Sequence, residues 1–356
     1  MLNHHRLGQL TELLKEHSWD ILVLYGHTWR KDFFRCLINA NFSGPHAAAV
    51  LDRSGQIRVL VADPWDAELL SAAGLAASAY ADLAADLGHL VSGKVAVAGL
   101  EFMERQFIPE GIAAPESATG AVEELRRVKT PEEIACIRQA AELADCGYRH
   151  FAETAERGMA EYELVAEVEA FLKARGAEDN FQLIASGGTE VTGMKPPTGR
   201  KFRDGDSITT ELTPRVNGYW AQICRTLVMG EPSAAQRESF AIFAEARKAA
   251  EDFLRPGVNI ADVARVQNDV FRKHGYGEYT GPQYTRVRGH GLGLHCDENP
   301  WILEDVNYTV KEGMVLIAHP NTYLPLAGYM VFGDSLLVTA NGCAPLNHTE
   351  RKLFQK

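Results

Sequence analysis

The chain has 356 residues and a net charge of −11 at pH 7, with 46% hydrophobic and 23% charged residues. This acidic balance leaves no basic face for a polyanion, so we expect neither a nucleic-acid nor an anionic-membrane partner. No apolar run approaches the ~20 residues that span a bilayer, and the first ten residues lack the apolar stretch of a signal peptide. The six cysteines are scattered without a CxxC pair, which is typical of reduced thiols. We therefore expect a cytoplasmic protein that is long enough for two domains.

The first third of the chain alternates short, β-branched segments with segments of helical spacing. Strands are expected at 20–26, 47–52, 57–62 and 94–100, and helices at 9–17 and 63–74. This alternation predicts a small α/β domain over residues 1–122.

The second domain is predicted over residues 123–356. Thr130 and Glu133 form a capping box, and Pro131 takes the first position of a long amphipathic helix that is expected to close at Gly158. Further helices are expected at 160–177, 233–257 and 260–277, and strands at 180–186, 206–214, 218–230, 313–320 and 328–342. Two helices followed by strands, twice over, predict a duplicated α+β domain with a curved antiparallel sheet.

Several short motifs occur together in this second domain: "IASG", "RKFRDGDSITTEL", "NGYW", "RTLVMG", "RPGVNIADV", "GHGLGL" and "KEGMVL". With "LRRVKTPEEIACIRQAAELAD" at the domain boundary, the whole chain resembles the creatinase, prolidase and methionine aminopeptidase family. The resemblance implies a pita-bread fold for the second domain and a creatinase-type α/β fold for the first. It also implies a homodimer, because the partner's small domain completes each pocket in creatinases.

The resemblance further implies which residues stand at metal-ligand positions. The metal-dependent members hold two divalent cations with two Asp, one His and two Glu, since hard cations prefer anionic oxygens. At these positions the chain has, in order, Glu211, Gln222, His290, His319 and Gly333. Because neutral Gln and Gly cannot offset the charge of two cations, no cofactor is expected. The alternative is a single Fe or Zn ion on Glu211, His290 and His319.

These replacements lead to a hypothesis about function. By its resemblance to creatinase, the chain is expected to be a metal-independent hydrolase that cleaves a C–N bond of a small polar substrate, which is an amidine, an amide or an N-substituted amino acid. Acid-base catalysis by His and carboxylate groups would carry the reaction. Two alternatives stay open: a mononuclear metal lyase or oxidative enzyme, and a binding protein without enzymatic activity.

The expected catalytic residues are titratable groups at or beside the family's ligand positions. Histidine is well suited, because an ordinary pKa near ~6.5 lets it accept and donate a proton near neutrality. A neighbouring carboxylate would fix the tautomer of the ring and raise its basicity. The candidates are His290, His319, Glu211, Asp297 and Glu298. Cys224 is interpreted as strand packing rather than as a nucleophile.

The expected substrate-binding residues come from three parts of the chain. Met194 takes the place of a substrate-binding His of the family, and Arg286 and Arg288 offer planar donor groups for a substrate carboxylate. Trp29 and Arg30 belong to the first-domain segment that matches the cover of the creatinase pocket. The complete set is Gln222, Met194, Tyr219, Arg286, Arg288, Trp29 and Arg30.

Overall fold

The computed structural model describes residues 1–109, 111–112 and 114–356. The chain divides into two compact units, Met1–Arg126 and Arg127–Lys356. The boundary predicted between residues 122 and 123 stands four residues before this division. Each unit is described by itself.

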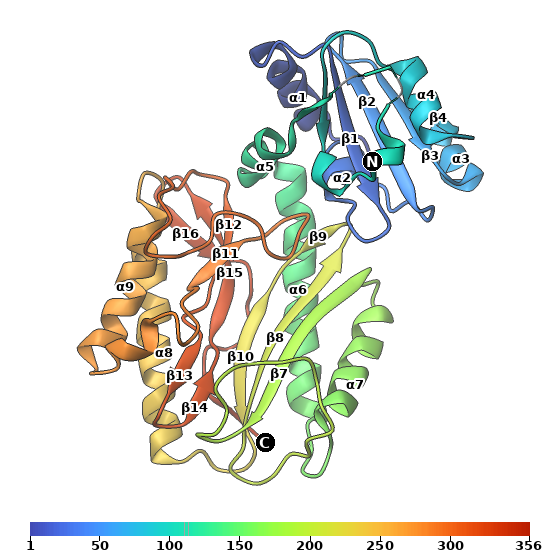
Figure 1. Ribbon diagram of the computed structural model, residues 1–356. Coiled ribbons are helices and arrows are strands. Elements are labelled where there is room, and N and C mark those ends of the chain that lie inside the picture. Colours follow the sequence, from blue (N-terminus) through green and yellow to red (C-terminus); the bar gives the residue numbers. More distant parts are fainter. Residues whose placement is uncertain (110, 113) are drawn as a thin grey trace. The chain divides into compact units, whose positions relative to one another are not determined.

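The first unit is built on a six-stranded sheet with the order β4-β3-β2-β1-β5-β6 (Figure 1). β2 pairs antiparallel with β1 and β3, whereas the remaining neighbours run parallel. The strands are β1 Ile21–His27, β2 His46–Asp52, β3 Ile57–Val61, β4 Ala76–Ala79, β5 Val95–Ala98 and β6 Glu116–Ser117. The predicted strands of the first third are therefore present, and two short strands join them.

Helices surround this sheet and close an apolar core. Val23, Val50 and Val97 of three neighbouring strands are buried together with Leu87 of α4. The helices are α1 His4–Glu16, α2 Asp32–Leu37, α3 Pro64–Ala72, α4 Leu83–Leu90 and α5 Thr119–Arg127, with 3-10 turns η1 Leu100–Phe102 and η2 Arg105–Phe107. The sequence pattern missed α2, α4 and α5, of which the first two have only six and eight residues, too few for a clear helical period.

The second unit begins at the predicted capping box. Thr130 N donates to Glu133 Oε2 over 3.0 Å, and Glu133 N donates to Thr130 Oγ1 over 3.4 Å. The helix that follows ends at Thr154, four residues before Gly158, because the backbone turns extended at Ala155. The helices of this unit are α6 Pro131–Thr154, α7 Glu161–Lys173, α8 Ala234–Phe253 and α9 Ile260–Lys273, with the 3-10 turn η3 Gly277–Thr280.

A nine-stranded sheet forms the centre of this unit. Its main path is β11-β12-β15-β10-β8-β7, with β16 on β15, β17 on β10 and β9 on β8. All pairings are antiparallel except β10 with β17. The strands are β7 Asp179–Gly187, β8 Ser207–Val216, β9 Tyr219–Trp220, β10 Ile223–Val228, β11 Gly289–Gly291, β12 Val315–Ala318, β15 Gly333–Thr339, β16 Gly342–Pro345 and β17 Phe354–Gln355, and β13 Thr322–Leu324 pairs with β14 Gly328–Met330 separately.

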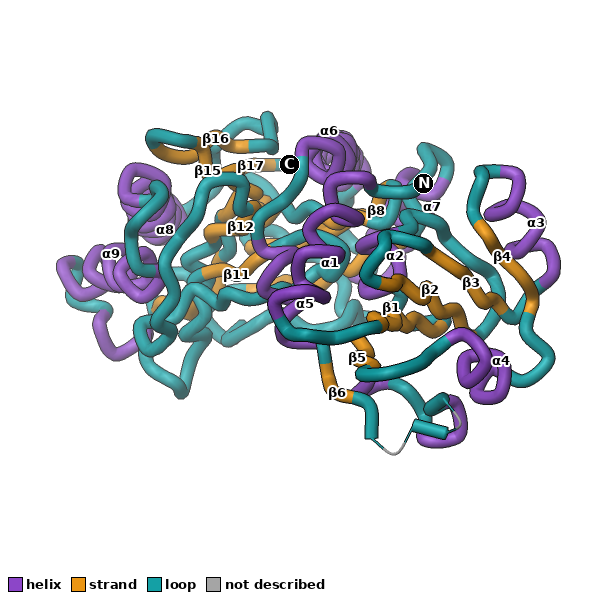
Figure 2. The backbone as a smooth tube through the Cα atoms, turned by 90° about the horizontal axis from the view of Figure 1, so that it is seen from above, coloured by secondary structure: helices purple, strands orange, loops and turns teal. Residues whose placement is uncertain are grey.

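The helices cover the two halves of this sheet separately. α6 and α7 lie along β7 and β8, whereas α8 and α9 lie side by side on the half that contains β12 and β15 (Figures 1 and 2). Each half has its own apolar core, with Tyr148 and Leu212 buried in one, and Val263 and Leu316 in the other. The predicted α+β class with a curved antiparallel sheet is confirmed. None of the helices in the described ranges is long and apolar enough to cross a membrane.

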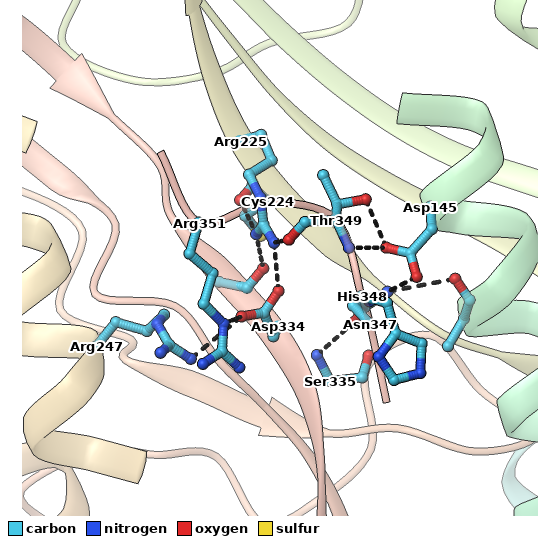
Figure 3. A network of polar contacts seen from close by, with 12 residues as sticks. Asp145, Cys224, Arg225, Arg247, Asp334, Ser335, Asn347, His348, Thr349 and Arg351 are labelled. Atoms are coloured by element: carbon cyan, nitrogen blue, oxygen red, sulfur yellow. Dashed lines mark hydrogen bonds and ion pairs between the residues drawn. The ribbon is translucent and has the colours of Figure 1, made fainter. Parts of the chain in front are cut away.

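Polar contacts tie the end of the chain to the sheet and to α6 (Figure 3). Asp145 of α6 accepts hydrogen bonds from His348 N over 2.7 Å, from Thr349 N over 3.0 Å and from Thr349 Oγ1 over 2.6 Å. In the same view, Asp334 of β15 receives three guanidinium groups, at 2.6, 3.1 and 3.1 Å. They belong to Arg225, Arg247 and Arg351.

Candidate functional site

The site lies where the two halves of the sheet meet. Cys224 of β10 pairs in register with Glu211 of β8 on one side and with Gly333 of β15 on the other. Asn321, which follows β12, donates a hydrogen bond from Nδ2 to Glu211 Oε1 over 2.6 Å. Residues from both halves of the duplicated unit therefore contribute to one polar centre.

Glu211 is a carboxyl group with unusual titration. Burial first, and then the nearby Asp297 carboxylate, raise the pKa of Glu211 to about 7, although the hydrogen bond from Asn321 lowers it. The Glu211 side chain nevertheless keeps part of its surface accessible. Because its pKa lies near 7 and solvent reaches it, this carboxyl group is able to take up and return a proton at neutral pH.

His290 sits on β11 in a backbone that requires glycine. Gly289 has a φ of 141°, and a Cβ there would lie 2.0 Å from Ile317 O. His290 Nδ1 is 2.9 Å from Gly291 O, and since a carbonyl oxygen only accepts, Nδ1 carries a hydrogen. His290 Nε2 then faces Asp297 Oδ1 at 3.2 Å. Burial lowers the pKa of His290, and Asp297 opposes that shift.

His319 comes directly after β12 and shares this centre. Its ring centroid lies 5.3 Å from that of His290, in an edge-to-face arrangement. His319 is buried, and neither ring nitrogen has a hydrogen-bond partner among the described residues. Burial lowers the pKa of His319 well below its ordinary value, and His290 adds to this. The ring is therefore neutral near pH 7, with one donor and one acceptor nitrogen.

The two acidic candidates of the loop after His290 have different surroundings. The Asp297 side chain is 40% exposed and faces His290. The Glu298 carboxylate lies 3.1 Å from Lys129 Nζ and accepts a hydrogen bond from His295 N over 3.1 Å. Of the two, Asp297 joins the polar centre, whereas Glu298 fixes the loop. A catalytic role for Glu298 stays a prediction without a contact in its favour.

Of the two hairpin candidates, Gln222 lies beside the polar centre, whereas the Tyr219 hydroxyl binds a residue of α6. Gln222 is buried beside the centre, where its Nε2 is 3.5 Å from Cys224 Sγ. Burial raises the pKa of the Cys224 thiol well above its ordinary value, which agrees with packing rather than nucleophilic chemistry. Tyr219 is buried too, but its hydroxyl donates to Glu133 Oε1 over 3.2 Å at the start of α6.

The two arginines before His290 make contacts that differ from the expected carboxylate recognition. Arg288 is completely buried and donates to Asn268 Oδ1 over 2.5 Å, to Thr285 O over 2.6 Å and to Asn321 O over 3.0 Å. These bonds brace the segment that holds Asn321. Arg286 forms an exposed ion pair with Asp305.

The remaining substrate-binding candidates, Met194, Trp29 and Arg30, make none of the contacts described above for the polar centre. Met194 is half-buried in the loop that returns along β7, where Lys195 exchanges backbone hydrogen bonds with Ile184 over 3.1 Å. Trp29, 91% exposed, and Arg30, paired with Asp32 over 3.1 Å, belong to the first unit. Their contribution to the site stays a prediction.

Asn321 is the site residue that sequence reasoning missed. It has no place among the family's ligand positions, and its importance comes from a contact with Glu211, 110 residues away. The only signal in the sequence is a polar side chain two residues after His319, at the end of a buried strand.

Comparisons with known proteins identify the class of fold and site. The model of metallopeptidase family M24 matches residues 135–340, more than half of the chain, so the chain belongs to this family. A Xaa-Pro dipeptidase of Pyrococcus furiosus is 34% identical over 235 residues, which cover 65% of this chain and 66% of the relative. The match thus spans just under two thirds of that relative's length.

Solved structures resemble the chain over almost all of its length. The prolidase from Pyrococcus horikoshii OT3 has a TM-score of 0.84 at 23% identity and covers 98% of this chain and 100% of its own. The X-Pro aminopeptidase from Thermotoga maritima MSB8 has a TM-score of 0.85 at 21% identity, with 98% and 99% covered. The expected pita-bread fold is confirmed, and the chain belongs to the M24 family.

These findings correct two expectations. The expectation of a metal-independent, creatinase-like hydrolase for non-peptide C–N bonds is wrong, because the family is one of metallopeptidases and the relatives are named Xaa-Pro dipeptidases. The lyase, oxidative and binding alternatives fall with it. The expectation of no cofactor, or of a single Fe or Zn ion, is contradicted by the same family assignment.

The donor set of this chain does not fit the two-cation site of the family. Within the described part of the chain, no three His, Cys, Asp or Glu side chains come together in a group that could hold a metal ion. Gln222 supplies a neutral amide and Gly333 no side chain at all. The family assignment implies metal ions that the donor set of this chain does not fit.

Proposed function

We propose that this chain hydrolyses the amide bond of a short, dipeptide-sized substrate at the centre formed by Glu211, His290 and Asp297. The observation that carries the proposal is Glu211, a deep but accessible carboxyl group with a pKa near 7, oriented by Asn321. The family membership and the dipeptidase names of the relatives support an amide substrate of this size.

The reaction needs one proton to move from water to the leaving group. As the oxygen of a water molecule bonds to the carbonyl carbon, Glu211 takes a proton from that water. The C–N bond then breaks, and Glu211 returns the proton to the departing amine nitrogen. Asn321 holds one oxygen of Glu211, which leaves the other oxygen to act as base and acid. His290, with Asp297, lies beside this carboxyl group as a second proton-carrying pair.

The assembly belongs to the same proposal. The enzyme acts as a homodimer in the cytoplasm on a small polar substrate, with Trp29 and Arg30 of the first unit near the partner's pocket. The scattered cysteines, typical of reduced thiols, support the compartment, and the resemblance to creatinases, whose pockets are completed by the partner, supports the dimer. Light scattering at micromolar concentration tests it, and a monomer there contradicts the dimer.

Turnover of a dipeptide panel tests the activity. Xaa-Pro dipeptides and dipeptides without proline are assayed by release of the free amino acid, once after chelation and once with added Mn²⁺, Co²⁺ or Zn²⁺. Glu211→Gln is expected to lower kcat by at least about 100-fold, since it removes the proton carrier. Wild-type protein that releases no amino acid from any dipeptide in any metal condition contradicts the proposal.

A further inference from the structure

His319 is a buried polar side chain with unmet hydrogen-bonding capacity. The residue is 5% exposed, and both ring nitrogens lack a partner among the described residues. Buried polar groups in proteins are almost always hydrogen-bonded, so a ring with two unmet nitrogens in a polar centre points to a ligand there.

The place of His319 depends on the absence of a side chain at residue 333. A Cβ on Gly333 would lie 2.7 Å from His319 Cβ and 2.7 Å from Ala318 O, which is closer than real contacts of this kind. A side chain at 333 would therefore require the backbone at Ala318 and His319 to shift.

The backbone around His319 is fixed on both sides of the ring. His319 N donates to Arg288 O over 3.1 Å, and Asn321 N donates to His319 O over 2.7 Å. The side chain of the same Asn321 holds Glu211 over 2.6 Å. One short segment thus sets the positions of both the imidazole and the proposed proton carrier.

We propose that His319 binds the carbonyl oxygen of the substrate amide through a ring N–H. This assignment rests on the proposed hydrolysis and names the group that polarises its substrate. The carbonyl oxygen gains negative charge as water adds to the carbon, so a donor fixed in advance stabilises that state more than the bound substrate. The hydrogen stays on the ring, and no covalent bond to His319 forms.

The charges of the centre favour a carbonyl oxygen over a carboxylate at this place. Glu211 and Asp297 both contribute acidic groups, and a substrate carboxylate beside them would be repelled. A neutral carbonyl oxygen accepts the hydrogen bond without that repulsion.

Two substitutions separate a donor from other roles of this side chain. His319→Gln keeps an N–H donor, whereas His319→Leu removes it; His274→Gln, at an exposed His paired with Glu245, is the control. We expect His319→Leu to lower kcat/KM roughly 100- to 1000-fold, with about tenfold of that loss in KM and the rest in kcat, and His319→Gln to recover at least tenfold of the loss. The pH profile should keep its shape in both. Equal kcat for Gln and Leu, or a titration limb lost in His319→Gln, overturns the assignment.

The bound metal and direct binding complete the test. If metal per chain falls in His319→Leu relative to wild type, His319 is a metal ligand and the assignment is overturned. If the wild type hydrolyses no dipeptide, the proposed function fails, and calorimetry with glycyl-proline then decides the inference alone. Binding at least tenfold weaker in His319→Leu supports it, and unchanged or absent binding rejects it.

Discussion

Asn321 and Glu211 share a 2.6 Å hydrogen bond across the junction between the two halves of the sheet. Asn321 Oδ1 also accepts from Phe332 N over 3.3 Å, and its carbonyl oxygen receives Arg288 Nη1 over 3.0 Å. An amide side chain held at both its nitrogen and its oxygen, on a backbone that is itself hydrogen-bonded, has little freedom, so it fixes which oxygen of Glu211 stays available to a substrate.

Asn321→Ala should weaken catalysis through Glu211. The hydrogen bond lowers the pKa of Glu211, so its removal raises that pKa, and the acidic limb of the pH–rate profile moves to higher pH. Loss of a bond of this kind, worth about 1–3 kcal/mol, corresponds to roughly a 10- to 100-fold fall in kcat/KM. Asn307→Ala, at an exposed side chain, is the control and should leave the profile in place. An unshifted limb in Asn321→Ala contradicts the coupling.

Glu211 should make the stability of the protein depend on pH. Its pKa in the folded protein, about 7, exceeds the ordinary 4.5, so the native state binds the proton more tightly. Stability from this group is complete below about pH 4.5 and is lost as the pH rises through 7, by at most roughly 3 kcal/mol. Glu211→Gln lacks this loss, so the free energies of unfolding of variant and wild type should diverge between pH 5 and pH 8. Parallel pH dependence of the two proteins in urea would falsify the shift.

Gly333→Ala should damage the site by overpacking. The added Cβ meets His319 Cβ and Ala318 O, each at 2.7 Å. We expect a loss of about 1–3 kcal/mol in the free energy of unfolding, together with reduced kcat as the imidazole shifts. Gly342→Ala, in β16 of the same sheet, has open space for its Cβ and should change neither quantity. Urea unfolding and dipeptide turnover measure both, and equal values for the two variants reject the packing argument.

Asp334→Asn should cost more stability than any surface ion pair. Asp334 is completely buried and its carboxylate meets three guanidinium groups, so its removal leaves buried positive charge without a partner. The expected loss is about 3–5 kcal/mol. Asp305→Asn, which breaks the exposed pair with Arg286, should cost less than about 1 kcal/mol. Denaturant unfolding of the two variants provides the comparison, and similar losses would refute the role of burial.

The elements of the fold that the sequence predicts best are those specified by local chemistry. The capping box at Thr130 and Glu133 involves neighbours three residues apart, and its two hydrogen bonds are present in the structure. The alternation of helices and strands in the second unit is equally local, because the spacing of apolar residues within each segment indicates whether that segment is a helix or a strand. The end of the same helix was placed four residues too late, since a glycine downstream does not by itself say where the backbone turns extended.

The site depends on contacts that no local pattern contains. Glu298 and Asp297 are adjacent in the sequence, yet Lys129, 169 residues away from Glu298, holds one of them while the other meets His290. The family's ligand positions led to Glu211, His290 and His319, but not to Asn321, whose contact spans 110 residues. The expectation about the metal was drawn from the donor residues alone. Those residues do not form a metal-binding group in the described part of the chain, whereas the family to which the chain belongs is one of metallopeptidases.

The bonds between Asp145 and residues 348 and 349 also constrain how the chain acquires its structure during synthesis. The partners are separated by 203 and 204 residues, so α6 leaves the ribosome long before the backbone amides that its carboxylate binds. Until residue 349 emerges, the Asp145 side chain lacks these partners and stays solvated or bound to a chaperone. The edge of β10 that pairs with β15 is likewise unpaired until β15 has been synthesised. The second unit should therefore gain protease resistance in one late step, rather than half by half as its duplicated pattern suggests.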